Sequence, residues 1–159
     1  MRVSVIMGSI SDKKIGDKVV EMLEKLEIEY EVKVISAHRT PHKAVEYVES
    51  AEENEIGVIV AIAGKAAHLA GVIAGLTTLP VIGVPAKSST MDGLDSLLSV
   101  VQMPTGVPVA TVAIDGGGNA GILAAQILSL GDNSLKERLK SYKQEMVDGV
   151  EDMNKELDY

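Results

Sequence analysis

Apolar runs of strand length alternate with amphipathic stretches along most of the chain. The runs typical of buried strands are residues 3–7, 30–35, 58–63, 81–84 and 109–114. The stretches between them repeat apolar residues every three or four positions, which predicts helices at residues 13–27, 41–54, 67–76, 93–101 and 119–130. Strands that alternate with helices predict a parallel sheet covered on both faces, which right-handed crossovers make doubly wound.

Residues 132–158 are predicted to form a long helix, appended to a core of residues 1–130 within a single domain of 159 residues. The apolar residues of this segment recur with helical spacing at Leu135, Leu139, Tyr142, Met146, Val150, Met153 and Leu157. A helix of about 24 residues is roughly 36 Å long, whereas a domain of this size has a radius of gyration of about 15 Å. The helix therefore either packs back on its own sheet or reaches a neighbouring subunit, and we favour the neighbouring subunit.

Composition narrows the classes of protein that fit this pattern. Hydrophobic residues make up 46% of the chain although Phe and Trp are absent, and an aliphatic core is typical of buried parallel strands. The absence of Cys excludes disulfides and thiol nucleophiles. A net charge of −8 disfavours nucleic acid and anionic membranes as partners, because both require a basic surface. With no signal peptide and no apolar run of about 18 residues, we expect a cytoplasmic protein.

Four polar loops follow predicted strands and are expected to meet, because the carboxyl ends of parallel strands share one edge of the sheet. These loops are residues 8–12, 36–39, 64–68 and 85–89. Their basic side chains are those of His38, Arg39, Lys65, His68 and Lys87. In an acidic protein, basic groups gathered beside helix N-termini predict a site for a small anion such as a phosphate.

Residues at the predicted helix starts have a structural interpretation as well as a functional one. Ser11 or Asp12 could cap the first helix. Alternatively, Ser9 and the helix amides could hold a phosphate or a ribose hydroxyl, with Asp12 on the ribose. Thr40 is expected to cap the second helix, which Pro41 begins.

The three histidines of the chain differ in their surroundings. His38 stands beside Arg39 at a strand end, which favours a proton carrier next to a planar group that suits phosphate or carboxylate. His68 lies among small apolar residues, where a buried histidine is the structural alternative. His42 is expected only to face outward from the second helix.

Two apparent motifs do not support a function. Residues 116–121 fit G-x-G-x-x-G, but a dinucleotide site needs a further strand and an acidic residue about 20 positions on, and a helix and the charged tail follow instead. Tight helix packing, or a loop that lets a ligand approach the backbone, explains these glycines better. His38 and His42 are four apart, but Pro41 starts a helix between them, so no metal site is expected.

Five motifs in order along the chain resemble those of the N5-carboxyaminoimidazole ribonucleotide mutase family, small carboxyl-shifting enzymes of purine biosynthesis. They are residues 7–12, 36–41, 66–69, 93–97 and 102–104, and the resemblance spans residues 3–130. It implies a flavodoxin-like three-layer α/β/α sandwich and a homo-octamer whose sites use several subunits. The octamer would give the tail helix its partner.

The resemblance also implies roles for particular residues. Ser9, Asp12 and Arg39 would hold the ribose phosphate, and His38 would be the proton carrier. The other substrate-binding residues implied are Ser11, Ser36, Gly64, Lys65, Ala66, His68 and Leu69.

The departures from the family pattern leave open the choice between the mutase branch and a sister carboxylase branch. The mutase branch usually has Gly at position 65 and Pro at position 70, where this chain has Lys65 and Ala70. A sister branch, which carboxylates aminoimidazole ribonucleotide directly with CO2, typically carries a cation at position 65. That branch has Lys at position 39 and no His at position 68. Arg39 and His68 therefore favour the mutase, while Lys65 keeps the carboxylase as the alternative.

The implied reaction needs positioning and one proton carrier, with no metal, biotin, ATP or other cofactor. A non-catalytic flavin- or phosphate-binding module is a different class of hypothesis. The absence of Trp and Phe to stack on a flavin argues against that module. A purely structural assembly protein would explain the tail but not the four polar loops.

Overall fold

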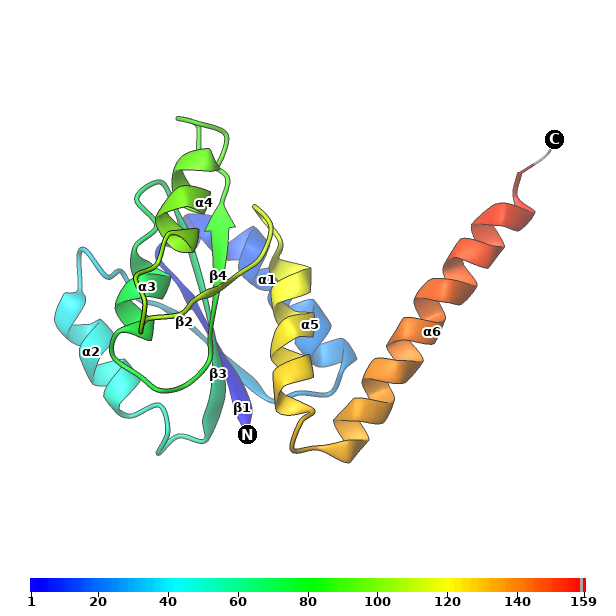
Figure 1. Ribbon diagram of the computed structural model, residues 1–159, viewed down its shortest axis with the longest axis horizontal. Coiled ribbons are helices and arrows are strands. Elements are labelled where there is room, and N and C mark those ends of the chain that lie inside the picture. Colours follow the sequence, from blue (N-terminus) through cyan, green and yellow to red (C-terminus); the bar gives the residue numbers. More distant parts are fainter. Residues whose placement is uncertain (158) are drawn as a thin grey trace.

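The predicted α/β/α sandwich is confirmed by a computed structural model that describes residues 1–157 and Tyr159 (Figure 1). The parallel sheet has the order β2-β1-β3-β4-β5, with β1 at Arg2–Met7, β2 at Tyr30–Val34, β3 at Ile56–Gly64, β4 at Val81–Ala86 and β5 at Ala110–Thr111. The helices are α1 (Lys13–Lys25), α2 (Pro41–Glu49), α3 (Leu69–Ala74), α4 (Leu94–Val101), α5 (Gly117–Leu128) and α6 (Asn133–Lys155). Residue 158, which belongs to the predicted tail helix, lies outside the described residues.

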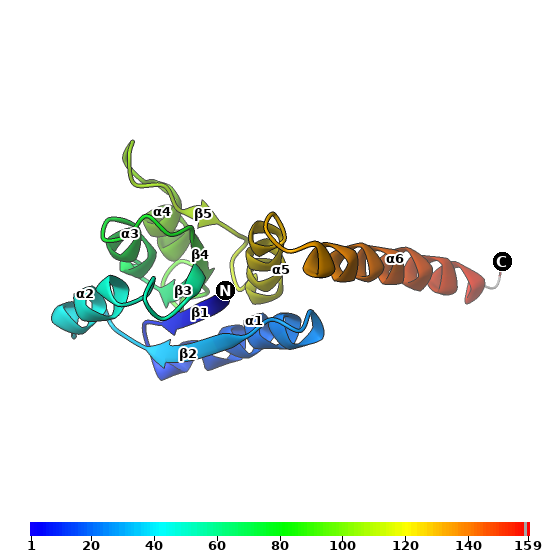
Figure 2. The ribbon, with the colours of Figure 1, turned by 90° about the horizontal axis from the view of Figure 1, so that it is seen from below.

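Alternate side chains of the central strand β3 build two separate cores. Val58, Val60 and Ile62 pack in the cluster with buried residues of α1 and α5. Ile59 and Ala61 pack on the opposite face in the cluster with buried residues of α2, α3 and α4. Figure 2 shows these three helices on the other side of the sheet from α1. Burial of both faces explains why the strand reads as an unbroken aliphatic run in the sequence.

The strand order places the winding reversal at the neighbouring strands β1 and β3. The chain leaves β1 through α1 on one face and leaves β2 through α2 on the other. Doubly wound sheets bind ligands outside the carboxyl ends of the strands at such a reversal. The fold therefore directs attention to the loops that follow β1, β2 and β3.

Two local predictions were wrong. The fifth strand, expected at residues 109–114, is confined to Ala110–Thr111, although the N–H groups of Val112 and Asp115 still donate to the β4 carbonyls of Gly83 and Pro85. Thr40 occupies the N-cap position of α2 but makes no side-chain cap hydrogen bond. Its hydroxyl instead donates to the Ser36 carbonyl (3.0 Å) and accepts from the Ser36 N–H (3.2 Å), which closes the loop that carries His38.

Two of the glycines of residues 116–121 serve tight helix packing, which is one of the two explanations that the sequence left open. A Cβ at Gly117 would lie 2.3 Å from the Ile15 carbonyl oxygen, and one at Gly121 would lie 3.0 Å from that of Val19. Helices α1 and α5 therefore approach so closely that their contact excludes side chains. No dinucleotide-binding role is needed to explain these glycines.

Helix α6 contacts the domain through the residues up to Glu145, whose carboxylate pairs with Lys25 of α1 at 2.7 Å. Leu135 is buried, and Leu139 and Tyr142 pack partly against the core next to α1, where the Lys25 ammonium lies 4.9 Å from the Tyr142 ring centre. Beyond them the helix extends away from the sheet (Figure 1). The apolar residues of this second half are exposed, namely Met146, Val150, Met153 and Leu157. None of the helices in the described part of the chain combines the length and hydropathy that crossing a bilayer requires.

Candidate active site

A cavity of about 660 Å³ opens at the carboxyl ends of β1, β2, β3 and β4. Its volume lies within the usual range for small-molecule sites, about 300–1,000 Å³. The predicted site residues that line it are Ser9, Ser11, Asp12, Ser36, His38, Arg39, Gly64, Lys65, Ala66 and Leu69. Segments far apart in the sequence therefore meet at one cavity, and each reaches it because it follows a parallel strand.

His68 is placed differently from the other predicted site residues. It is not part of the cavity wall but stands behind His38, with its Nδ1 3.0 Å from the Nε2 of His38. The two rings meet edge to face, with an interplanar angle of 84°. Both residues are exposed, so the alternative of a buried His68 is wrong.

Arg39 fastens the first two loops to each other. Its Nη2 donates to the Gly8 carbonyl at 2.8 Å, and its Nε and backbone N–H both donate to the Ser36 hydroxyl at 3.2 Å. The remaining guanidinium N–H groups make no hydrogen bond within residues 1–157 and Tyr159, so they are available for an anion. The guanidinium is thus pre-oriented at the cavity by the backbone that it holds.

The loop after β1 is organised by Ser9 rather than by Ser11 or Asp12. The Ser9 hydroxyl accepts from the Ser11 N–H at 3.3 Å and caps a 3-10 turn at Ile10–Asp12. Asp12 makes no side-chain cap hydrogen bond at the start of α1. Burial raises the pKa of the Asp12 carboxyl above its ordinary value, the nearby Asp115 carboxylate adds to the rise, and hydrogen bonds from Ser9 and Ser11 oppose it. The cavity therefore holds a carboxylate that the protein does not fully stabilise.

Replacing Asp12 with Asn is expected to stabilise the ligand-free protein. A carboxyl whose folded pKa is raised favours folding only below its unfolded pKa, ordinarily about 3.8, and that contribution is lost as pH rises through the folded value. Because Asp12 is only partly buried, water screens the effect, and we expect Tm to rise by about 1–2 °C at pH 7. The rise should shrink as pH falls toward 4.

Asp17→Asn is the matched control for this measurement. Asp17 is an exposed acid on α1 that pairs with Lys13 at 2.7 Å, so its neutralisation removes the same charge without relieving burial. Thermal unfolding of both variants at pH 7 and pH 4.5 tests the assignment. If Asp17→Asn raised Tm as much as Asp12→Asn does, the stabilisation would not come from relieving the burial of Asp12. If Asp12→Asn did not raise Tm at all, the destabilising role assigned to its carboxylate would be wrong.

Lys65 occupies a backbone conformation that ordinarily favours glycine. Its φ is +58°, in the left-handed region, and its carbonyl accepts from the Ala67 N–H at 2.8 Å to form the turn before α3. A side chain in this region costs about 1 kcal/mol relative to Gly. The turn thus gives a physical reason for the Gly expected in the mutase branch, and this chain tolerates the strain while placing an exposed cation on the cavity wall.

The loop after β4 adds three residues to the site for which the sequence predicts no individual role. Lys87, Ser88 and Ser89 line the cavity, and the sequence predicts only that their loop is polar and basic. The Ser88 hydroxyl, which is buried, donates to both carboxylate oxygens of Asp95 at 2.9 and 2.8 Å. Asp95 belongs to a family motif, but only the structure shows that it holds this loop.

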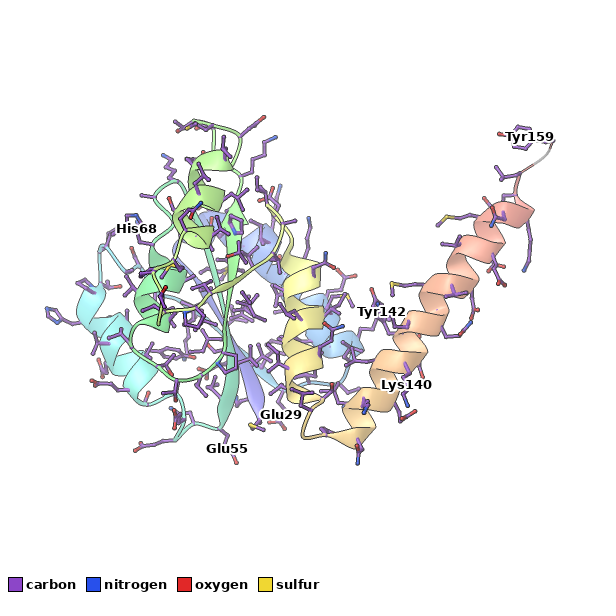
Figure 3. The ribbon with its side chains drawn as sticks, in the orientation of Figure 1. Glu29, Glu55, His68, Lys140, Tyr142 and Tyr159 are labelled. Atoms are coloured by element: carbon purple, nitrogen blue, oxygen red, sulfur yellow. The ribbon has the colours of Figure 1, made fainter. Side chains whose placement is uncertain are left out.

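The other hollows of the molecule lie away from these loops. One of about 400 Å³ is lined by Arg2, Glu24, Glu27, Ile28, Glu29 and Tyr30. Figure 3 shows Glu29 and Glu55 at the opposite end of the sheet from His68. Carboxylates dominate that end, so it does not suit an anionic ligand. No group of three or more potential metal ligands forms within the described residues.

A parallel sheet with an imidazole and several cations around a cavity at its carboxyl edge defines a flavodoxin-like enzyme for a small anionic substrate. Comparison with known proteins agrees with this class. The family model described as AIR carboxylase matches residues 2–149. The chain therefore belongs to the AIR carboxylase family, and the resemblance found in its motifs is confirmed.

Individual relatives cover nearly the whole chain. The N5-carboxyaminoimidazole ribonucleotide mutase of Pyrococcus abyssi is 57% identical over 91% of this chain and 83% of its own length, and that of Thermotoga maritima is 55% identical over 91% and 85%. The chloroplastic phosphoribosylaminoimidazole carboxylase of Vigna aconitifolia is 50% identical over 91% of this chain but only 26% of its own length. The crystal structure of Treponema denticola PurE superposes with a TM-score of 0.90 at 29% identity, covering 99% of this chain and 98% of that one.

Proposed function

We propose that this protein converts N5-carboxyaminoimidazole ribonucleotide to 4-carboxy-5-aminoimidazole ribonucleotide in purine biosynthesis. The observation that carries the proposal is the meeting of His38 and Arg39 with Ser9 and Asp12 at one cavity. This set offers a proton carrier beside groups that suit a ribose phosphate. The full-length relatives of highest identity quoted above bear the name of this mutase.

Arg39, Ser9 and Asp12 are assigned to the ribose phosphate, supported by Ser11 and Ser36, whose hydroxyls lie in the same loops. Gly64, Lys65, Ala66 and Leu69 form the wall on the other side of the reversal point and are assigned to the base and its carboxylate. A Cβ at Gly64 would lie 3.4 Å from the Ala86 carbonyl oxygen, so the end of β3 is in van der Waals contact with the end of β4 at this wall.

The reaction needs one proton to move between two atoms of the substrate. The N–C bond of the carbamate breaks and releases CO2, and His38 supplies the proton that the nitrogen takes up. C4, which behaves as an enamine carbon, then forms a bond to the trapped CO2. His38 takes back the C4 proton and the ring regains its aromaticity. Imidazole suits both transfers because its charge changes near neutral pH.

Direct carboxylation of 5-aminoimidazole ribonucleotide with CO2 is the alternative, and Lys65 is the residue that favours it. One assay separates the two reactions. The protein receives either the N-carboxylated nucleotide alone or aminoimidazole ribonucleotide with bicarbonate and carbonic anhydrase, and formation of the 4-carboxylate is followed by ultraviolet absorbance. Conversion of the first substrate supports the mutase, whereas conversion of only the second would establish the carboxylase.

We further propose a cytoplasmic homo-octamer in which the second half of α6 packs on a neighbouring subunit. Its exposed apolar residues include Val150, with 57% of its surface accessible, and Met153, with 67%. An isolated chain would leave this stripe in water, whereas a neighbouring copy would bury it. Nucleic acid and membranes are not proposed as partners, since the chain is acidic.

Combining Met146→Glu with Val150→Glu is expected to reduce the assembly to smaller species, because the two charges would enter an apolar contact. Size-exclusion chromatography with light scattering measures the mass. The control combines Ser141→Glu with Gln144→Glu, at exposed polar positions of the same helix, and should keep the native mass. A native protein of single-chain mass, or an unchanged mass in the apolar-face variant, would contradict the proposal.

A further inference from the structure

The contact between His38 and His68 uses one particular nitrogen of each ring. Nε2 of His38 and Nδ1 of His68 are 3.0 Å apart, at hydrogen-bonding distance. Nδ1 of His38 makes no hydrogen bond within the described residues, and His38 lines the cavity. Of the two nitrogens of His38, one is therefore occupied by a neighbouring side chain and the other is left for a ligand.

This hydrogen bond links the protonation of Nδ1 of His38 to that of Nε2 on the same ring. When both rings are neutral, the shared proton belongs to one ring or the other. If His38 donates it from Nε2, Nδ1 carries a lone pair and can accept a proton. Once Nδ1 is protonated, His38 is a cation whose Nε2–H still donates to His68, so the contact remains satisfied in both states.

We propose that His68 is a positioning residue that holds Nε2 of His38 and thereby makes Nδ1 the nitrogen that exchanges the proton with the substrate. The inference rests on the proposed function for the identity of the substrate, but not for the hydrogen bond itself. It differs from the role expected from the sequence, in which His68 binds the substrate directly.

The proton balance fits this assignment. His38 begins as the cation and gives the Nδ1 proton to the substrate nitrogen as the N–C bond breaks and CO2 leaves. It is then neutral, with its remaining proton on Nε2 directed at His68. When C4 has bonded to CO2, the C4 proton passes to Nδ1 and His38 is a cation again. The cycle needs no proton from solvent and no other reactant.

Three variants test the role of His68 through kinetics. His68→Phe removes the hydrogen-bond partner, and we expect kcat to fall about 10–100-fold with KM within about threefold, the size that lost orientation of a catalytic group produces. His68→Asn places an amide near the position of Nδ1 and should recover most of the loss. His42→Phe, at the exposed histidine of α2, should keep native kinetics. Equal losses in the Phe and Asn variants, a loss confined to KM, or a kcat within twofold of native in His68→Phe would overturn the proposal.

A spectroscopic measurement separates this proposal from the proposed function. Labelling with 15N-histidine gives signals from only three residues, and ring 15N shifts report which nitrogen carries the proton. At pH 8 we expect the ring 15N shifts of His38 to show a single tautomer, with the proton on one nitrogen, in the native protein and in His68→Asn. In His68→Phe the two tautomers should exchange, so that the two 15N shifts are averaged. The shifts of His42 should be averaged in all three proteins. Averaged nitrogens of His38 in the native protein would refute the positioning role, whereas absence of turnover with a fixed tautomer would refute only the proposed function.

Discussion

Replacing His38 with Asn is expected to abolish turnover while leaving nucleotide binding largely intact. Asparagine cannot carry a proton between the substrate nitrogen and C4, and loss of a general acid–base group ordinarily costs about 10²–10⁴ in rate. The anion-binding groups do not depend on the imidazole, because Arg39 is held by Gly8 and Ser36 rather than by His38. The kcat of the variant, and its product affinity by calorimetry, measure the two effects separately.

His42→Asn is the matched control, since it makes the same substitution three residues from Arg39 at an exposed position on α2. It should retain native kcat and affinity. Near-native turnover by His38→Asn would refute the assignment of the proton carrier. Loss of affinity together with loss of kcat would show instead that the imidazole holds the nucleotide.

The meeting of the loops could be predicted from sequence because it depends only on the parallel sheet. Ser9, His38 and Lys65 each follow a recognisable aliphatic run, and parallel strands bring such positions to one edge. The sequence does not reveal which side chains make hydrogen bonds within these loops or which of them face the cavity. Ser9 rather than Asp12 acts as the cap, and His68 lies behind His38 rather than on the cavity wall.

These details depend on distances between side chains that are remote in sequence. The pair of Ser88 and Asp95 and the contact of Arg39 with Gly8 leave no periodic signal, since each joins different loops or elements. The left-handed conformation of Lys65 was equally hidden, because Lys gives no sign of a positive φ whereas Gly would. The family motifs include Gly8, Arg39 and Asp95 without giving their contacts, and they do not include Ser88.

The role of the glycines at residues 116–121 likewise cannot be decided from the sequence alone. Their sequence fits a phosphate-binding turn, a flexible loop or a close helix contact, and only the distances to α1 decide among these. Gly117 and Gly118 are neighbours of identical type. A Cβ at Gly117 would meet the Ile15 carbonyl oxygen at 2.3 Å, whereas one at Gly118 would meet the Met22 side chain at 3.8 Å, an ordinary contact.

Gly117→Ala is therefore expected to be strongly destabilising. The Ile15 oxygen belongs to the backbone of α1 and cannot rotate away, so α1 and α5 would have to separate along a buried contact. Overpacking of this kind costs about 1–3 kcal/mol, and we expect the upper end because backbone must move. In a chain of this length 3 kcal/mol lowers Tm by roughly 6–12 °C, which thermal unfolding measures directly.

Gly118→Ala supplies the control at the adjacent position of the same helix. Because its Cβ has room, the substitution should be neutral or stabilise α5 by up to about 1 kcal/mol, the difference in helix propensity between Ala and Gly. The contrast between the two variants isolates the contact with α1 from any general effect of removing a glycine. Equal Tm values for both variants would show that the helices do not approach as described. They would also reopen the question of whether this glycine run serves a ligand rather than the packing of α1 against α5.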